Sequence, residues 1–129
     1  MEKKAIVWVR EDLRIDNNPA LSYASQNHEA VSVLYIYNKK NFDNKREAQK
    51  WWLSKSLEFF LNDLKKFNIS LEIIAGDELE IFSKIKKNDN VAIYWSKVYE
   101  PGIISKGKKI RDLFLKNEIH YKYFKGNIL

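Results

Sequence analysis

Five charged residues gather directly after the first apolar run of the chain. Residues 8–21 read Trp-Val-Arg-Glu-Asp-Leu-Arg-Ile-Asp-Asn-Asn-Pro-Ala-Leu, so that Arg10, Asp12 and Arg14 alternate in sign. Guanidinium and carboxylate groups at such close spacing can lock a loop through charge-assisted hydrogen bonds. The simpler alternative is a solvated loop ahead of a helix that is capped by Asn18 and has Pro19 at its first position.

Residue patterns typical of self-sufficient catalysis are missing from the rest of the chain. No G-x-G-x-x-G follows the first apolar run, and neither a P-loop nor a G-x-S-x-G occurs. The absence of cysteine excludes disulfides, thiolate zinc sites and thiol catalysis. His28 fits a turn residue and His120 a structural strand residue better than either fits a metal ligand. We therefore expect no catalytic residue and no metal site.

Strand-like and helix-like patterns alternate along the whole chain. Short apolar runs rich in β-branched and aromatic residues predict strands at 5–9, 30–37, 71–75, 91–95 and 119–124. Helical patterns lie between them at 19–25, 45–67, 77–86 and 103–117, and residues 38–44 read as a polar turn. A stripe at helical spacing is expected to face the sheet and consists of Leu53, Leu57, Phe60, Leu64 and Phe67.

This alternation predicts one domain over residues 1–129, a Rossmann-like three-layer α/β/α fold. Its five-stranded parallel sheet is expected to have the order 3-2-1-4-5. Ligands bind such sheets beyond the carboxyl ends of the strands, where the strand order switches. A site is therefore expected among residues 10–18, 38–50, 76–77 and 96–107.

The charge and hydropathy of the chain restrict its partners. The net charge is +6, and only four of the 23 basic residues are arginine. A nucleic-acid binder that reads bases would use more arginine, so the lysines indicate a solubilising surface. No apolar run approaches the ~20 residues of a membrane span, and residues 5–9 are too few for a signal peptide. We expect a cytoplasmic protein without a membrane partner.

Residues 8–21 resemble the opening motif of the photolyase/cryptochrome family, W-x-R-x-D-L-R-x-x-D-N-P-A-L. The matching positions are Trp8, Arg10, Asp12, Leu13, Arg14, Asn18, Pro19, Ala20 and Leu21. Asn17 departs from the motif, which has aspartate there. Residues 50–57 are similar to the second-helix motif of the family, and residues 92–101 to its W-N-x-x-Y-x-P segment with Ser96 in place of asparagine. The tail, residues 124–129, resembles the point where the family's first domain passes into a long linker.

The resemblance implies the N-terminal domain of a deoxyribodipyrimidine photolyase, which repairs cyclobutane pyrimidine dimers in DNA with light and FAD. In this family a C-terminal helical domain holds FAD and the damaged DNA. We expect that domain to be absent here, so that the chain is not catalytic alone and FAD and DNA are partners of the parent protein. The alternatives are the corresponding domain of a cryptochrome photoreceptor, or a free-standing nucleotide-binding or interaction module of the same fold.

The resemblance also implies an antenna chromophore, which in the family is a folate, a deazaflavin, a flavin or nothing. Folate-binding members carry an Asn-Glu pair where this chain has Gly102 and Ile103, so methenyltetrahydrofolate is not expected. A deazaflavin or flavin is favoured, in a crevice near Tyr35, Tyr37, Lys50, Ser96, Val98, Gly102 and Ile103. Trp51 is expected on the polar face of its helix, as a contact for a chromophore or another domain.

Overall fold

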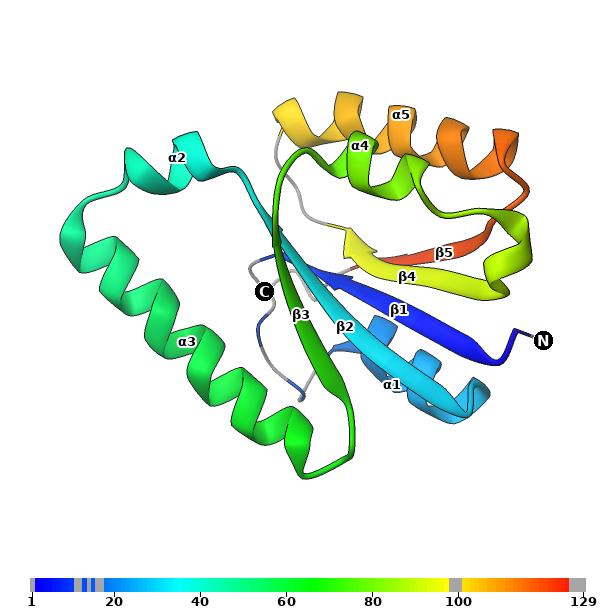
Figure 1. Cartoon of the computed structure of the whole chain (residues 1–129), viewed down its shortest axis with the longest axis horizontal. Coiled ribbons are helices and arrows are strands. Elements are labelled where there is room, and N and C mark those ends of the chain that lie inside the picture. Colours follow the sequence, from blue (N-terminus) through cyan, green and yellow to red (C-terminus); the bar gives the residue numbers. More distant parts are fainter. Residues whose placement is uncertain (1, 11–12, 14, 16–17, 98–100, 126–129) are drawn as a thin grey trace.

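Five parallel strands form the centre of the structure, a computed structural model that describes residues 2–10, 13, 15, 18–97 and 101–125. The strands are β1 (Lys4–Val9), β2 (Ala30–Tyr37), β3 (Ser70–Ala75), β4 (Val91–Lys97) and β5 (His120–Lys125). They lie in the order β3-β2-β1-β4-β5, and every neighbouring pair is parallel (Figure 1). The predicted sheet and its order are confirmed.

Helices cover both faces of this sheet, as the three-layer prediction requires. They are α1 (Pro19–Asn27), α2 (Lys39–Asp43), α3 (Glu47–Lys65), α4 (Glu78–Ser83) and α5 (Pro101–Lys116), with a short 3-10 helix, η1 (Lys87–Asp89), before β4. Helices α1 and α3 pack on one face, and α4 and α5 pack on the other (Figure 1). The two faces are called the α1/α3 face and the α4/α5 face below.

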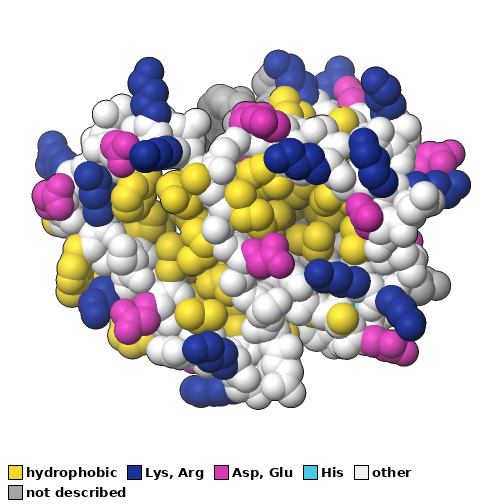
Figure 2. Space-filling model, viewed as in Figure 1, with side chains coloured by type: hydrophobic (Ala, Val, Ile, Leu, Met, Phe, Trp, Pro, Cys, Tyr) yellow, Lys and Arg dark blue, Asp and Glu magenta, His cyan; other side chains and the backbone are white. Residues whose placement is uncertain are grey.

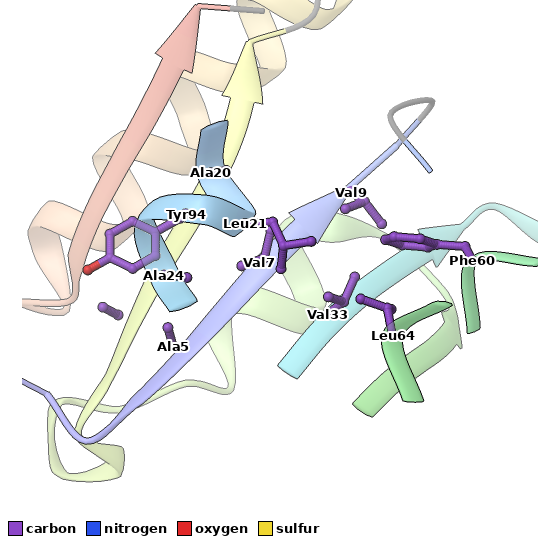
Figure 3. Packing of buried hydrophobic residues seen from close by; sticks show 11 residues of the cluster. Ala5, Val7, Val9, Ala20, Leu21, Ala24, Val33, Phe60, Leu64 and Tyr94 are labelled. Atoms are coloured by element: carbon purple, nitrogen blue, oxygen red, sulfur yellow. The ribbon is translucent and has the colours of Figure 1, made fainter. Parts of the chain in front are cut away.

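Each face has its own hydrophobic cluster, because alternate residues of a strand point to opposite sides. On the α1/α3 face, Val7 and Val9 of β1 meet α1 and the buried side chains Phe60 and Leu64 of α3 (Figure 3). On the α4/α5 face, Trp8 is buried among the large rings of α4, β4 and α5.

Polar side chains cap the N-termini of three helices. The Asn18 carboxamide oxygen accepts from the backbone N–H of Leu21 at 3.2 Å, and Pro19 follows at the first helical position, as predicted. The Asp77 carboxylate caps α4 in the same way. Asn38 also caps a helix, so the polar turn expected over residues 38–44 was wrong: it contains α2. A helix of five residues is too short to show an apolar period in the sequence.

The end of α3 differs from the prediction. Phe67 was expected to face the sheet, but it is 61% exposed because the helix already ends at Lys65. Asn68 adopts the left-handed conformation with φ 58°, and the N–H of Ile69 returns to the carbonyl of Leu64 at 3.1 Å. This C-terminal capping turn directs Phe67 away from the helical stripe.

Other helix boundaries also differ from the prediction by a few residues. Helix α4 ends at Ser83, three residues before the predicted end, and η1 fills part of the remaining connection to β4. Helix α5 begins at Pro101, two residues earlier than predicted, since proline is well suited to the first turn of a helix. These shifts leave the predicted order of elements unchanged.

Candidate functional site

A pocket of about 520 Å³ lies at the carboxyl ends of β1 and β2, beside the first half of α3. Its lining consists of Arg10, Leu13, Tyr35, Lys45, Ala48, Gln49, Trp52, Leu53 and Ser56. The lining thus combines two cations with two large aromatic side chains, and no carboxylate is among its described residues. Its place agrees with the rule that ligands bind parallel sheets at the carboxyl ends of the strands.

The guanidinium group of Arg10 packs on a tryptophan ring of the core. It directly follows β1, and its guanidinium carbon lies 3.9 Å from the ring centroid of Trp8. The Trp8 ring is buried and makes edge-to-face contacts with Phe82 of α4 and Trp95 of β4. A cation stacked on a fixed tryptophan ring has few other orientations available. The guanidinium of Arg10, a residue that also lines the pocket, is therefore restricted in its orientation by Trp8.

The helical wall of the pocket comes from one flank of α3. Ala48, Gln49, Trp52, Leu53 and Ser56 follow one another at helical spacings and so lie on the same side of the helix. The Gln49 side chain also accepts from the backbone N–H of Arg46 at 3.1 Å, which caps the start of the helix. Gln49 falls within the predicted site region 38–50, whereas Trp52 lies outside it, although its helical spacing from Gln49 was a readable signal.

A smaller hollow of about 170 Å³ lies next to the pocket. It is lined by Tyr35, Tyr37, Phe42, Leu53, Ser54, Leu57 and Ile73. Tyr35 and Leu53 line both spaces. The Lys50 ammonium lies 5.7 Å from the Phe42 ring centroid and 3.6 Å from the Glu47 carboxylate. Lys50 is thus beside the hollow without lining it.

The structure brings together only some of the residues predicted for a chromophore crevice. Tyr35 borders both spaces, and Tyr37 borders the smaller hollow. Ser96 is at the carboxyl end of β4 and lines neither space; its Oγ is buried without a hydrogen-bond partner among the described residues. Gly102 and Ile103 are in the first turn of α5, where the structure describes no side chains, and Val98 lies outside the described residues.

The loop motif after β1 is only partly described. Trp8, Arg10 and Asn18 have the positions given above, whereas Asp12 and Arg14 lie outside the described residues. The proposed locking of this loop by alternating charges therefore stays a prediction. The structure confirms the predicted N-cap at Asn18 and adds that the Trp8 ring supports Arg10.

His28 is buried, and the sequence-based interpretation as a simple turn residue was incomplete. It lies in the connection from α1 to β2 with 9% of its surface exposed. Its Nδ1 is 2.6 Å from the Glu2 carbonyl oxygen, and its Nε2 is 2.6 Å from the Tyr94 hydroxyl. Because a carbonyl can only accept, Nδ1 donates and Nε2 accepts from Tyr94. Burial, together with the nearby Tyr23 and Glu2, raises the pKa of Tyr94 to about 12, so the hydroxyl keeps its proton.

His120 joins Glu2, His28 and Tyr94 in a polar cluster at the amino end of the sheet. Its Nδ1 lies 3.1 Å from the Glu2 carboxylate. Burial acts to raise the pKa of that carboxyl, but hydrogen bonds to its own backbone and to His120 outweigh burial and lower it. Within the part of the chain that the structure describes, no three His, Cys, Asp or Glu residues could hold a metal ion. No helix of that part is both long and apolar enough to cross a bilayer.

A wider groove of about 930 Å³ lies near this polar cluster, at the amino ends of the strands. Its lining is mainly small polar and aliphatic, and its charged residues Lys4 and Glu29 have opposite signs. It therefore lacks the concentrated positive charge of the pocket near Arg10. We take the smaller pocket at the carboxyl ends as the candidate site, because charge and aromatic surface converge there.

Comparisons of the sequence with known proteins give consistent matches. A family model described as DNA photolyase matches residues 5–129. The deoxyribodipyrimidine photo-lyase of Agrobacterium fabrum is 29% identical over 125 residues, which cover 96% of this chain and 26% of that protein. Cryptochrome-2 of Arabidopsis thaliana is 25% identical over 132 residues, which cover 100% of this chain and 22% of that protein.

Solved structures show the same fold. A class III photolyase from Agrobacterium tumefaciens superposes with a TM-score of 0.84 at 26% identity, over 98% of this chain and 26% of that one. An archaeal photolyase from Sulfolobus tokodaii superposes with a TM-score of 0.83 at 28% identity, over 95% of this chain and 29% of that one. The latter is described as containing two FAD molecules, with the implication of a novel light-harvesting cofactor. The chain thus spans between 22% and 29% of these relatives' lengths.

Proposed function

Because this chain belongs to the DNA photolyase family, we propose that it is a chromophore-binding α/β domain that works with a flavin-containing partner domain. Residues 1–129 would form this one domain. The parent reaction would be light-driven, FAD-dependent repair of pyrimidine dimers in DNA. FAD and damaged DNA would then bind to a helical domain, in the part of the relatives that this chain does not match. The chain itself would bind and orient a light-absorbing group without making or breaking bonds.

The observation that carries this proposal is the lining of the pocket. Arg10 and Lys45 supply positive charge, while Tyr35 and Trp52 supply flat aromatic surface. A flavin with a phosphate tail needs both, since its rings can stack on aromatic side chains and its phosphate can pair with cations. Pockets for small molecules commonly have volumes of ~300–1,000 Å³, and the volume here, about 520 Å³, falls in that range.

A flavin or deazaflavin is favoured over methenyltetrahydrofolate for two reasons. Gly102 and Ile103 replace the Asn-Glu pair that folate-binding members carry, which removes the carboxylate and amide from that position. The relative from Sulfolobus tokodaii supports a flavin, since that protein is described with a second FAD. When bound, such a group would supply light absorption, and the side chains of this chain would hold its rings and its anionic end.

Two neighbouring tryptophans allow a matched test of the site. Trp51 and Trp52 are 61% and 69% exposed, but only Trp52 lines the pocket. We expect the chain to bind FAD or FMN with quenching of flavin fluorescence, and Trp52→Ala to weaken binding by at least about 10-fold through lost stacking. Trp51→Ala should bind as the parent chain does. Equal losses in the two variants would contradict the assignment.

Charge provides a second, independent test. Lys45 lines the pocket, whereas Lys55 pairs with Glu58 on an exposed side of α3. Lys45→Gln should weaken the binding of FMN but leave riboflavin, which has no phosphate, unchanged. Lys55→Gln should affect neither ligand. If Lys45→Gln weakened both ligands equally, the phosphate would have to bind elsewhere.

Further experiments test the folate prediction and the division of labour between domains. The purified chain should retain no methenyltetrahydrofolate; a folate that survives gel filtration and is identified by mass spectrometry would contradict this. With added FAD and light, it should not repair thymine dimers, and measurable repair would overturn the proposed non-catalytic role.

A cryptochrome domain is the second candidate, because cryptochrome-2 of Arabidopsis thaliana matches this chain over its full length. A light-driven repair assay on a protein that contains both domains would distinguish the two, since only a photolyase should restore the pyrimidines. A stop codon directly after Leu129 in the source gene would instead favour a free-standing module of this fold.

A further inference from the structure

The two edges of the sheet differ in their protection against pairing with another strand. The sequence of β5 is His-Tyr-Lys-Tyr-Phe-Lys, and the Lys122 ammonium lies 4.5 Å from the Tyr23 ring centroid. The sequence of β3 is Ser-Leu-Glu-Ile-Ile-Ala, which has no lysine, no proline and a single charged residue, Glu72. Lysine and proline on edge strands are common devices against association. By this criterion β5 is protected and β3 is not.

Backbone groups along the outer side of β3 are available for a further strand. The N–H of Gly76 donates to the Tyr37 carbonyl of β2 at 2.9 Å. Successive residues of a strand direct their N–H and C=O groups to alternate sides, so the even-numbered residues of β3 face β2. Leu71, Ile73 and Ala75 therefore direct their N–H and C=O groups outward, where the described sheet has no further strand.

Apolar side chains flank this outer edge. Ile73, near the middle of β3, is 48% exposed, and Ala75 is also exposed. Figure 2, seen from the same side as Figure 1, shows hydrophobic side chains gathered on both sides of the strand nearest the viewer, toward α3 and toward α4. A strand edge with open backbone groups and apolar flanks is suited to strand addition.

We propose that β3 pairs in antiparallel fashion with β3 of a second copy of this chain, about a two-fold axis at Ile73. The two sheets would then form one continuous sheet. In this register Leu71 lies opposite the partner's Ala75, and Ile73 lies opposite the partner's Ile73. Glu72 lies opposite the partner's Ile74, so no like charges meet along the strand. Each pair of outward-facing residues exchanges two backbone hydrogen bonds.

Charges at the two ends of β3 favour a second copy as the occupant. Lys65 and Lys66 precede the strand, whereas Asp77, Glu78 and Glu80 follow it. An antiparallel partner places the basic end of each strand beside the acidic end of the other. A parallel partner would place like charges together. Lys66 now pairs with Asp63 at 3.6 Å, but both side chains are mostly exposed, so the pair can be exchanged at little cost.

Substitution at the proposed two-fold axis is the most direct experiment. Sedimentation velocity of the full chain over a range of concentrations should show a reversible dimer. Ile73→Lys would bring two ammonium groups face to face, and we expect it to weaken the dimer by at least about 30-fold. The matched control is Leu115→Lys on α5, because Leu115 is apolar and 64% exposed but far from β3 in the fold. The control should dimerise as the parent chain does.

A charge swap tests the antiparallel direction of the partner strand and remains informative if Ile73→Lys fails to fold. Glu80→Lys and Lys66→Glu alone should each weaken the dimer by about 3- to 10-fold, since each brings like charges together where the basic end of one strand meets the acidic end of the other. The double variant should recover most of the affinity. Circular dichroism and thermal melts would show that all variants are folded.

Three results would overturn the proposal. The chain could remain a monomer at every concentration studied. The dimer could survive Ile73→Lys, or show no recovery in the double variant. Finally, the dimer could be disrupted by Phe59→Ser and not by the β3 variants, which would move the interface to the exposed aromatic side of α3.

Discussion

The two faces of the sheet are packed to very different extents. On the α4/α5 face, Trp8, Phe82, Trp95 and Phe114 contact one another at ring-centroid distances between 5.1 and 5.9 Å. On the α1/α3 face, the 19-residue helix α3 buries only Phe60 and Leu64. The pocket and the smaller hollow both border α3. The α4/α5 face, called the closed face below, thus supplies stability. The α1/α3 face, called the open face, leaves room for a ligand.

The two faces nevertheless depend on each other through β1. Trp8 belongs to the closed face, yet its ring supports the guanidinium of Arg10, which lines the pocket. The rigidity of one face therefore positions a charge for the other. Binding sites built on fixed elements hold their groups more accurately than sites built on loops alone.

Removal of a ring from the closed face should have the largest effect on stability. Phe82→Ala is expected to lower the free energy of unfolding by about 3–5 kcal/mol, since the ring is fully buried between Trp8 and Phe114. Phe60→Ala on the open face should cost at least about 1 kcal/mol less, because α3 can move toward the sheet and reduce the cavity. Chemical denaturation measures both, and Phe59→Ala is the exposed control. Equal losses for Phe82 and Phe60 would show that the faces are equally rigid.

The second largest effect on stability is expected from the buried hydrogen bond between Tyr94 and His28 on the α1/α3 face. Tyr94→Phe removes the donor to His28 Nε2 and should cost about 1–3 kcal/mol of unfolding free energy. Tyr37→Phe, a half-buried tyrosine, should change stability by less than about 0.5 kcal/mol. The same denaturation experiment checks both variants. A neutral Tyr94→Phe would indicate that water replaces the lost hydroxyl.

A smaller effect is expected on the loss of stability at acid pH. The folded pKa of Glu2 is below the ordinary value of 4.5, so its contribution to stability is present above pH 4.5 and is lost as the pH falls through the folded pKa. Glu2→Gln should remove that part of the acid dependence, which is expected to be at most about 1 kcal/mol. Unfolding free energies between about pH 6 and 3 measure it. Glu29→Gln, at an exposed position, should leave the dependence of stability on acid pH unchanged.

The smallest expected change is a gain in stability. The buried Oγ of Ser96 has no hydrogen-bond partner among the described residues, and the side chain shares the α1/α3 face with Ala92 and Tyr94. Ser96→Ala should therefore raise the unfolding free energy by about 0.5–1 kcal/mol. A loss of stability would mean that a group outside the described residues bonds to this hydroxyl.

Much of the fold could be predicted from the sequence, because the strongest signals are local and repeated. Runs such as 5–9 and 30–37 are apolar on both sides and can only be strands of a covered parallel sheet. Asn18 and Asp77 identify helix starts by residue type alone. The misplacement of Phe67 and the missed helix α2 concern single turns, which are too short to show a period.

The candidate site was less accessible to prediction, because it depends on contacts between distant segments. The rule for the carboxyl ends of strands pointed to Tyr35 and to the region after β1, where Tyr35 and Arg10 line the pocket. It could not show that Arg10 rests on Trp8, or that α3 turns Gln49 and Trp52 toward the same space. The burial of His28 likewise depends on Tyr94, which is 66 positions away in the chain.

Tyr35 and Leu53 form a partition between two compartments, since both side chains border the larger pocket and the smaller hollow. The extent of the proposed binding space is therefore set by two side chains rather than by the backbone. Rotation or replacement of Tyr35 would join the compartments and extend the accessible space toward Ile73. Under the proposed function, substitutions at positions 35 and 53 would change which chromophore fits, with the sheet unchanged.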